Sequence, residues 1–195
     1  MTPLGRLAVW RRVIARGVFP HQFSWVLELP WRRIVLSPEA LASRLPIGTR
    51  SAVLELGAGS GYYSIEVARR VRTGRLELFD LQAEMLERCR AKCAPAGLTN
   101  VGYIVGDAAA LPFGRACFDV VFMVAVLGEV RDRAGGLTSI RRVLKPGGVL
   151  SISEHLPDPD FTTLRSLRRH AERVGLVVEH VYGLPWAYTA NLRSP

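Results

Sequence analysis

Short apolar segments of strand length alternate along the chain with segments in which apolar residues recur every three or four positions. The first kind of pattern is typical of strands and the second of amphipathic helices. Val120 and Val121 lie in a continuous β-branched run, as expected for a parallel strand buried on both faces. The pattern predicts strands at 51–56, 75–79, 101–105, 118–124, 149–153, 176–182 and 187–193, and helices at 65–71, 83–94, 137–144 and 162–174.

Alternating strands and helices predict a parallel sheet connected by right-handed crossovers. The last two strands are joined by a short turn that contains Gly183 and Pro185, so they must run antiparallel. We therefore expect a doubly wound α/β fold with a mostly parallel, seven-stranded sheet whose last strand is reversed. Residues 1–40 lie outside this pattern and form a separate N-terminal extension, and residues 41–195 form the main domain.

The distinctive residues fall at the carboxyl ends of the predicted strands, where open α/β sheets bind their ligands. The glycine turn Gly57-Ala58-Gly59-Ser60-Gly61 closes the first strand and permits a close approach of a ligand to the backbone. Asp80 closes the second strand, where its carboxylate can accept hydrogen bonds from a ribose diol. Asp107 closes the third strand and is placed to bind the exocyclic amine of a purine.

The spacing of the glycines distinguishes between nucleotide ligands. Dinucleotide-binding proteins use G-x-G-x-x-G, in which the following helix receives a pyrophosphate. Here the third glycine, Gly61, comes one residue early, and the bulky pair Tyr62-Tyr63 occupies the start of the helix. This favours a ligand without a diphosphate. Because NAD-binding proteins begin with a similar glycine turn, an NAD-dependent oxidoreductase is the alternative.

Five segments in order resemble the motifs of class I S-adenosylmethionine-dependent methyltransferases, between about Ser51 and Ser153. The nearest likeness is to the small-molecule branch that includes the ubiquinone/menaquinone-type methylases, which implies a Rossmann-like fold and transfer of a methyl group to a small-molecule, lipid or quinone-like acceptor. A protein that binds the cofactor without transferring methyl is a second alternative. The segments are VLELGAGSGYYS, FDLQAEML, GDAAALPF, FDVVF and RRVLKPGGVL.

The resemblance implies roles for matching residues. The glycine turn would wrap the methionine part of S-adenosylmethionine, Glu55 would order its amino group, and Asp80 would hold the ribose. Val124 and Ala125 would lie beside the transferable methyl group. The complete set of expected cofactor-binding residues is Glu55, Gly57, Ala58, Gly59, Gly61, Tyr62, Asp80, Leu81, Met85, Asp107, Ala108, Val124 and Ala125.

No catalytic residue is assigned, and no metal site is expected. The quinone-type methylases usually carry a histidine after the fourth strand, whereas this chain has Leu127-Gly128-Glu129. Glu129 is interpreted as a solvent-facing residue at a helix start, with a place in the substrate pocket as the alternative. His155 is the better pocket candidate, although a structural role is also open to it. Trp186 and Tyr188 either reach the mouth of the site or pack.

The chain carries a net charge of +9, almost all from arginine, since Lys92 and Lys145 are its two lysines. The arginines are dispersed, which is typical of a solvated surface, so no nucleic-acid partner is expected. No apolar run approaches the roughly 20 residues of a membrane-spanning helix, and we expect a cytoplasmic protein. The three cysteines imply no disulfide framework.

The N-terminal extension is rich in aromatic residues, with Trp10, Phe19, Phe23 and Trp25 among its arginines. So many large apolar groups need a burial partner. The hypothesis favoured by the resemblance is a lid over the substrate pocket, because related small methylases close their sites with N-terminal helices. A partner subunit and peripheral contact with an anionic membrane are the alternatives. The sequence does not determine the oligomeric state.

Overall fold

The computed structural model describes residues 31–193, with side chains from residue 33. Two short helices, α2 (Trp31–Val35) and α3 (Pro38–Arg44), precede the sheet. Ser37 caps α3, because its hydroxyl oxygen accepts a hydrogen bond from the Ala40 amide. Residues 1–30, which make up most of the predicted lid, lie outside the described part of the chain.

Seven strands and five helices, one of them a 3-10 helix, follow α3 within the described residues, and each predicted strand is present. The helix after the fourth strand begins at Arg133, four residues earlier than its apolar pattern indicated, because Asp132 caps it by accepting a hydrogen bond from the Gly135 amide. The elements are β1 (Ala52–Leu56), α4 (Ser64–Arg70), β2 (Arg75–Asp80), α5 (Ala83–Cys93), β3 (Val101–Val105), the 3-10 helix η2 (Ala108–Ala110), β4 (Phe118–Val124), α6 (Arg133–Val143), β5 (Leu144–His155), α7 (Leu164–Arg173), β6 (Val177–Leu184) and β7 (Ala187–Arg193).

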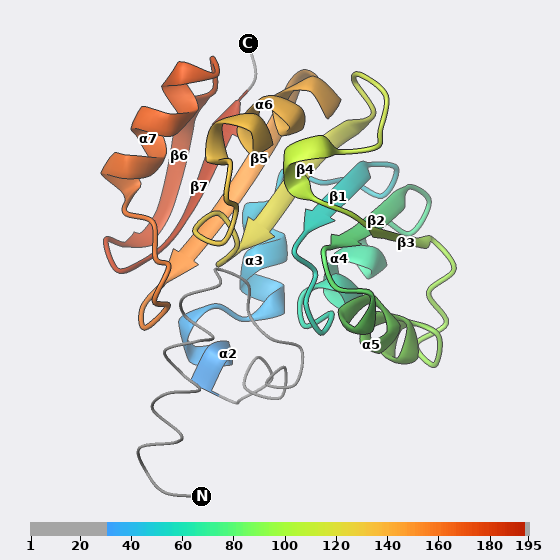
Figure 1. Ribbon diagram of the computed structural model, residues 1–195. Coiled ribbons are helices and arrows are strands. Elements are labelled where there is room, and N and C mark those ends of the chain that lie inside the picture. Colours follow the sequence, from blue (N-terminus) through green and yellow to red (C-terminus); the bar gives the residue numbers. More distant parts are fainter. Residues whose placement is uncertain (1–30, 194–195) are drawn as a thin grey trace, which may run out of the picture.

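The sheet has the order β3-β2-β1-β4-β5-β7-β6, which can be followed from right to left in Figure 1. All neighbouring pairs are parallel except β5–β7 and β6–β7, so β7 alone is reversed. The expected mostly parallel sheet with a reversed last strand is therefore confirmed. Strand order changes direction between β1 and β4, and the carboxyl ends of these two strands mark the position at which doubly wound folds bind ligands.

The prediction was wrong about the start of β5. Pro146 and the glycines after it were expected to separate a helix from a strand at Val149, but β5 begins at Leu144. Leu144 pairs with Phe118 at the start of β4, and a shift of register before Val120 accommodates the Pro-Gly-Gly segment within the ladder.

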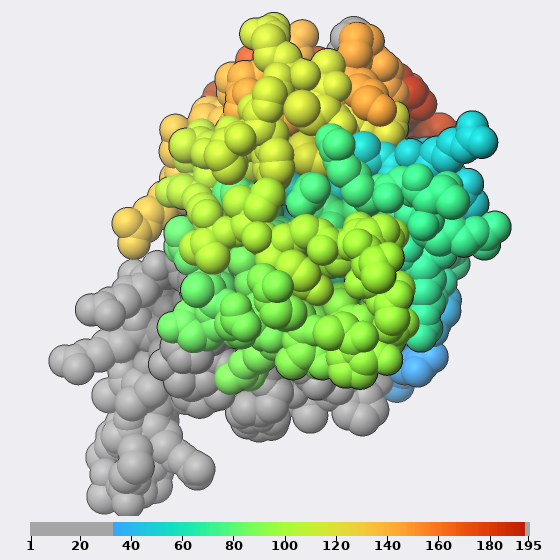
Figure 2. All heavy atoms as spheres, turned by 90° about the vertical axis from the view of Figure 1, so that its right-hand side faces the viewer, coloured from blue at the N-terminus to red at the C-terminus, as the bar shows by residue number. Residues whose placement is uncertain are grey.

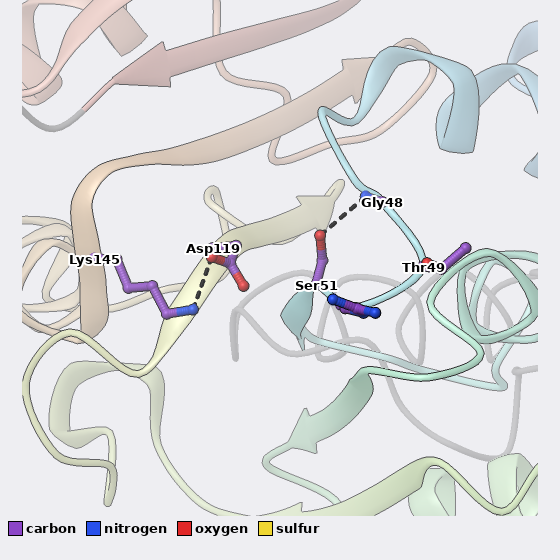
Figure 3. A pocket seen from close by; sticks show the side chains of 6 residues that line it. Gly48, Thr49, Ser51, Asp119 and Lys145 are labelled. Carbon is purple, nitrogen blue, oxygen red and sulfur yellow. Dashed lines mark hydrogen bonds and ion pairs between the residues drawn. The ribbon is translucent and has the colours of Figure 1, made fainter.

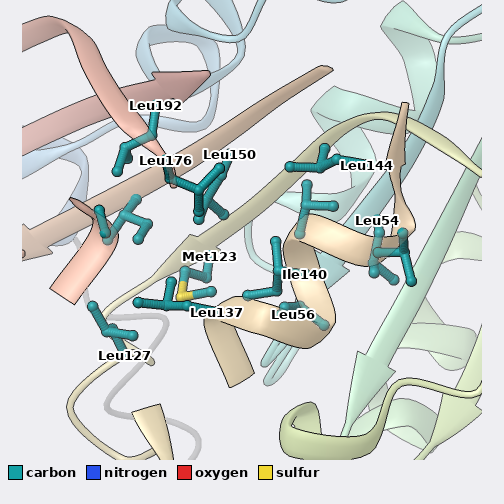
Figure 4. Close-up of a cluster of buried hydrophobic side chains, with 14 of the residues drawn as sticks. Leu54, Leu56, Met123, Leu127, Leu137, Ile140, Leu144, Leu150, Leu176 and Leu192 are labelled. Atoms are coloured by element: carbon teal, nitrogen blue, oxygen red, sulfur yellow. The ribbon is translucent and has the colours of Figure 1, made fainter. Parts of the chain in front are cut away.

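Apolar side chains fill both faces of the sheet. Neighbouring residues of a strand point to opposite faces, so Leu54 packs beneath α6 and α7 while Val53 packs beneath α3 and α4. Figure 4 shows the first of these two clusters, in which leucines of β1, β5 and β7 meet Leu137 and Ile140 of α6. The two clusters hold the strand ends, and hence the loops that follow them, in fixed positions.

The two edges of the sheet differ. Figure 2 views the molecule from the β3 edge, where α5 and the segments on either side of β3 cover much of the surface. At the other edge β6 is exposed along almost its whole length. No helix within residues 31–193 has the length and apolar character needed to cross a membrane.

Candidate functional site

The turn between β1 and α4 places three glycines in the left-handed region of backbone conformation. Gly57, Gly59 and Gly61 have φ values of 67°, 55° and 77°, which a residue with a side chain rarely adopts. The turn is fixed to the next strand, because the amides of Gly57 and Ala58 both donate to the carbonyl of Phe79 at 2.8 and 3.3 Å. The glycine turn thus stands at the carboxyl ends of both β1 and β2.

Cys89 of α5 supports the turn from below. Its thiol donates a hydrogen bond to the Gly59 carbonyl at 3.2 Å, and a Cβ at Gly61 would lie 3.1 Å from its sulfur. Cys89 and Cys93, one helical turn apart, are both buried. The contact with the glycine turn was not predicted, because helical spacing gives the face of a residue but not the loop above that face.

Asp80, the last residue of β2, is directly bonded to the glycine turn. One carboxylate oxygen accepts from the Gly59 amide and the other from the Gln82 amide, each at 2.9 Å. Only 7% of Asp80 is exposed, and burial raises the pKa of this carboxyl against the opposing effect of its backbone donors. Leu81, the next residue, is 53% exposed. The end of β2 therefore presents a fixed carboxylate beside an uncovered apolar side chain.

Glu55 lies beneath the same turn on β1 and is 3% exposed. Its carboxylate oxygen accepts a hydrogen bond of 2.7 Å from the hydroxyl of Ser64, the first residue of α4. Burial, with a smaller contribution from the charge of Asp80, raises the pKa of Glu55 to about 8. The raised pKa favours the neutral carboxyl near pH 7, and a cation bound beside it would favour its ionisation.

The third predicted carboxylate, Asp107, stands at the end of the segment that follows β3. It is exposed and accepts a hydrogen bond from the Ala109 amide at 2.9 Å, which caps η2. Ala108 begins this short helix. Met85, which was expected to flank the same ligand as Leu81, is a buried residue of α5 and is 2% exposed.

The end of β4 lies on the other side of the glycine turn. Val124 is its last residue, and Ala125 follows with a φ of 55°. The Ala125 amide donates to the Ser153 carbonyl of β5 at 2.8 Å, which holds this conformation in place. A Cβ at Gly57 would collide with the side chain of Val126, so the glycine turn and the segment after β4 are in close contact.

A group of buried polar residues at the end of β5 was missed by sequence reasoning. Glu154 is 1% exposed, and its Oε2 accepts a hydrogen bond from the Thr162 amide at 3.2 Å. The Tyr188 hydroxyl donates to the carbonyl of the same Thr162 at 2.7 Å. The available signal was the strand alternation, which places Glu154 on the same apolar face as Leu150 and Ile152.

The other candidates on the acceptor side are placed as follows. Glu129 lies in a half-buried turn four residues before α6, so the interpretation as a solvent-facing residue at the helix start was wrong. His155 is the last residue of β5 and is buried opposite Ala187 of β7. Tyr188 is buried and packs against Phe161, whereas Trp186 on the β6–β7 connection is 55% exposed.

A shallow cavity of about 420 Å³ lies at the other end of the strands, near their amino ends (Figure 3). Lys145 and Asp119 form an ion pair of 2.7 Å beside it, and Ser51 accepts a hydrogen bond from the Gly48 amide. These residues stand near the amino ends of β1, β4 and β5. None of the predicted cofactor-binding residues lines this cavity, and ligands of doubly wound folds bind at the carboxyl ends of the strands.

The groups gathered around the glycine turn fit S-adenosylmethionine. The cofactor has an ammonium group, a ribose diol and an adenine amine, and the carboxylates of Glu55, Asp80 and Asp107 lie at or just beyond the carboxyl ends of three adjacent strands. The hydroxyl oxygen of Ser60, within the turn, is buried and has no hydrogen-bond partner among the described residues. Buried polar atoms of this kind are normally satisfied, which is consistent with a polar ligand at the turn.

Comparisons with known proteins agree with this geometry. Residues 53–148 match the family model described as a methyltransferase domain. A ubiquinone/menaquinone biosynthesis C-methyltransferase, UbiE of Haemophilus ducreyi, is 39% identical over 112 residues, which cover 55% of this chain and 43% of the relative. The chain spans about half the length of the curated relatives that it matches.

Solved structures share the fold. A SAM-dependent methyltransferase from Aquifex aeolicus has a TM-score of 0.84 at 21% identity, covering 91% of this chain and all of that one. The [4+2]-cyclase SpnF has a TM-score of 0.73 at 17% identity, covering 81% of this chain and 79% of that protein. At these identities the likeness shows a common fold and does not specify the reaction.

Proposed function

Residues 53–148 place the chain among the class I S-adenosylmethionine-dependent methyltransferases, and from this premise we propose that it transfers the cofactor's methyl group to a small-molecule acceptor. The observation that carries the proposal is the joining of Asp80 to the glycine turn through the Gly59 amide. This bond brings a buried carboxylate from β2 beside the buried Glu55 of β1. Both groups suit a cationic ligand with a ribose and no phosphate.

We propose the following roles for the chain's own residues. The backbone of Gly57, Ala58, Gly59 and Gly61, with Tyr62, holds the methionine part of the cofactor, and Glu55 ionises to bind its ammonium group. Asp80 accepts hydrogen bonds from the ribose hydroxyls. Leu81 and Met85 flank the adenine, Asp107 and Ala108 bind its polar edge, and Val124 and Ala125 lie beside the methyl group.

The cofactor supplies an activated methyl group on a sulfonium whose leaving group is a neutral thioether. The protein therefore contributes mainly by holding the acceptor in line and by excluding water, and positioning of this kind supplies roughly 7–11 kcal/mol. The left-handed Ala125 turn, held by Ser153, gives the acceptor side a defined wall next to the reacting atoms.

We infer that the acceptor carries a hydroxyl-bearing, quinone-like ring. The name of the Haemophilus ducreyi relative supports a C-methylated quinone precursor as the model for the acceptor. The test is turnover of labelled S-adenosylmethionine with a panel of naphthols and naphthohydroquinones, with naphthalene as the control that lacks a hydroxyl. Label found in the hydroxylated rings supports the proposal, and label found in none of them contradicts it.

We propose that the N-terminal segment covers the acceptor and helps to select it. Residues 1–30 lead directly into α2 and α3, and Leu36 and Tyr63 join this region to the start of α4 through a hydrogen bond of 3.3 Å. Deleting residues 1–30 should leave cofactor affinity within about tenfold and remove turnover. Full turnover of the truncated protein would contradict the lid, and binding to anionic vesicles or dimerisation that is lost on truncation would assign the segment to a membrane or a second subunit.

A protein that binds the cofactor without methyl transfer is the second candidate, because SpnF shows that a [4+2]-cyclase has the same fold. The two candidates differ in one measurement. Cofactor binding together with the absence of labelled product across the whole acceptor panel favours the second.

A further inference from the structure

Glu154 has a buried carboxyl oxygen without a hydrogen-bond partner in the part of the chain that the structure describes. Oε2 accepts from the Thr162 amide, while the buried Oε1 makes no hydrogen bond to any described residue. The hydroxyl of Thr162 is also buried and unpartnered. A buried polar atom without a hydrogen bond costs roughly 1–3 kcal/mol, so a purely structural role would be better served by an apolar side chain.

The position of Glu154 connects it to the acceptor side of the site. The preceding residue, Ser153, pairs with Val124 at the end of β4 and accepts the Ala125 amide. Glu154 itself points to the α6 and α7 face, where its neighbour across the ladder is Tyr188. Glu154 is thus the residue of β5 that directly follows the ladder partner of Val124, at the strand end where we place the methyl group.

The loops after β4 and β5 enclose this group. A Cβ at Gly128 would overlap the backbone of Asp160, so the two loops are in contact and Gly128 makes that contact possible. Thr162, in the loop after β5, is held at both its amide and its carbonyl, by Glu154 and Tyr188. The contact between Glu154 and Thr162 thus belongs to the same loop that meets the segment after β4.

The charges around Glu154 do not fix its ionisation by pairing. Burial is the largest influence and raises the pKa of Glu154 to about 8, with Asp158 and Glu129 adding to the rise and Arg133 opposing it. The Tyr188 hydroxyl packs against the same carboxyl, and its own pKa is raised by burial and by Glu154. A carboxyl with such a pKa changes its protonation state near neutral pH, as a proton acceptor must.

Given the proposed methyl transfer, we propose that Glu154 is a catalytic residue that hydrogen-bonds a hydroxyl group on the ring of the acceptor and takes its proton. The ring carbon forms its bond to the methyl group as the carbon–sulfur bond breaks and its electron pair stays on sulfur. The hydroxyl proton passes to the Glu154 carboxylate. Loss of the proton from the methylated carbon restores the ring, Glu154 returns its proton to the oxygen, and one proton is released overall.

Infrared difference spectroscopy tests this step without turnover, with 1-naphthol as the probe. Glu55 and Glu154 should each contribute a neutral carboxylic acid band at pH 7, which its loss in Glu55→Gln or Glu154→Gln would assign. Addition of S-adenosylmethionine should remove the Glu55 band, because the bound ammonium group ionises that carboxyl. Addition of 1-naphthol to the cofactor-loaded protein should then shift the remaining Glu154 band, whereas naphthalene should leave it unchanged.

The variant Glu154→Gln keeps the side-chain volume and an oxygen that accepts from the Thr162 amide. It should weaken 1-naphthol binding by about tenfold, the value of one hydrogen bond, and leave naphthalene binding unchanged. Glu172→Gln, at an exposed position of α7, is the control and should bind both probes as the wild type does. With a turned-over naphthol, the rise of kcat with pH toward about pH 8 should disappear in Glu154→Gln.

The outcomes separate two failures. A Glu55 band that survives addition of the cofactor, with no cofactor binding, contradicts the proposed function. Normal cofactor binding with an unmoved Glu154 band, absence of 1-naphthol binding, or equal 1-naphthol affinity in Glu154→Gln overturns the role of Glu154. If Glu154→Gln did not fold, the response of the wild-type band to 1-naphthol and naphthalene would decide.

Discussion

The buried carboxyl groups in the two halves of the sheet differ in how completely they are hydrogen-bonded. In the half formed by β1, β2 and β3, Asp80 receives two backbone amides and Glu55 receives the Ser64 hydroxyl. In the half formed by β4, β5 and β7, one oxygen of Glu154 and the hydroxyl of the neighbouring Thr162 have no hydrogen-bond partner within residues 33–193.

This difference follows the chemistry expected of each half. A cofactor that is the same in every member of a family suits a site whose carboxyls are held in place before it binds. An acceptor site whose carboxyl group has an unsatisfied oxygen depends on its ligand to complete it, and so is selective for ligands with the matching polar group. The predictions below test this contrast in order of decreasing effect.

The largest effect is expected from Gly59→Val. Gly59 has a φ of 55°, and a branched side chain there would both strain the turn and occupy the approach of the cofactor. Cofactor binding should be lost, by more than about a hundredfold, while circular dichroism shows a folded sheet. Gly97→Val is the matched control, because Gly97 has a similar φ of 68° and open space around it. Retained binding in folded Gly59→Val would show that the turn does not hold the cofactor.

Both halves should respond to pH through their buried glutamates. Glu55 and Glu154 hold a proton more tightly in the folded chain, where each pKa is about 8, than at the ordinary value of 4.5. The free energy of unfolding should therefore fall as pH rises from about 4.5 to about 8, by on the order of 4 kcal/mol for each residue. Urea unfolding across this range measures the slope.

Glu55→Gln and Glu154→Gln should each reduce the dependence of the unfolding free energy on pH. The bound cofactor should offset the cost of ionising Glu55 at high pH, and it should not offset the cost of ionising Glu154. Equal rescue of both variants by the cofactor would contradict the assignment of the two glutamates to different ligands.

Asp80→Ala should weaken S-adenosylmethionine binding by about 1.5–3 kcal/mol, the usual size of a lost charged hydrogen-bond pair. Part of this loss comes from the Gly59 amide, which Asp80 holds. Asp119→Ala is the control, because Asp119 lies near the amino end of β4, far along the strand from the glycine turn, and pairs with Lys145. An unchanged dissociation constant for Asp80→Ala in calorimetry would remove Asp80 from the cofactor site.

The smallest effect is expected from Cys89→Ala, which removes the thiol that donates to the Gly59 carbonyl. Cofactor affinity should fall by no more than about tenfold, since a single weak hydrogen bond to the turn is lost. Cys93→Ala, on the same buried face of α5, should leave cofactor affinity unchanged. Equal affinities of the two variants would show that the sulfur does not position the turn.

The strands, the reversal of the last strand and the strand-end positions of the candidate cofactor residues could be predicted because their signals are local in sequence. The glycine turn, Asp80 and Asp107 each directly follow an apolar run, so one rule about strand ends places them all. The acceptor side has no such signal. Glu154 meets Thr162 and Tyr188 only through the packing of a loop and a reversed strand, and the contact of Gly128 with Asp160 joins two loops that are distant in sequence.

The start of β5 shows a second limit of the sequence pattern. Pro146 and two glycines ordinarily end regular structure, yet the pairing of Leu144 with Phe118 brings this segment into the ladder. Tertiary pairing between strands overrode the local preference, as is common in sheets.

The most direct test of the account is calorimetric titration with S-adenosylmethionine at pH 7, carried out in two buffers of different ionisation enthalpy. The account predicts binding with release of about one proton per site, because the cofactor's ammonium group ionises Glu55, and it predicts no proton release in Glu55→Gln and no binding of NAD. Binding of NAD in place of S-adenosylmethionine, or cofactor binding without any proton release, would contradict it.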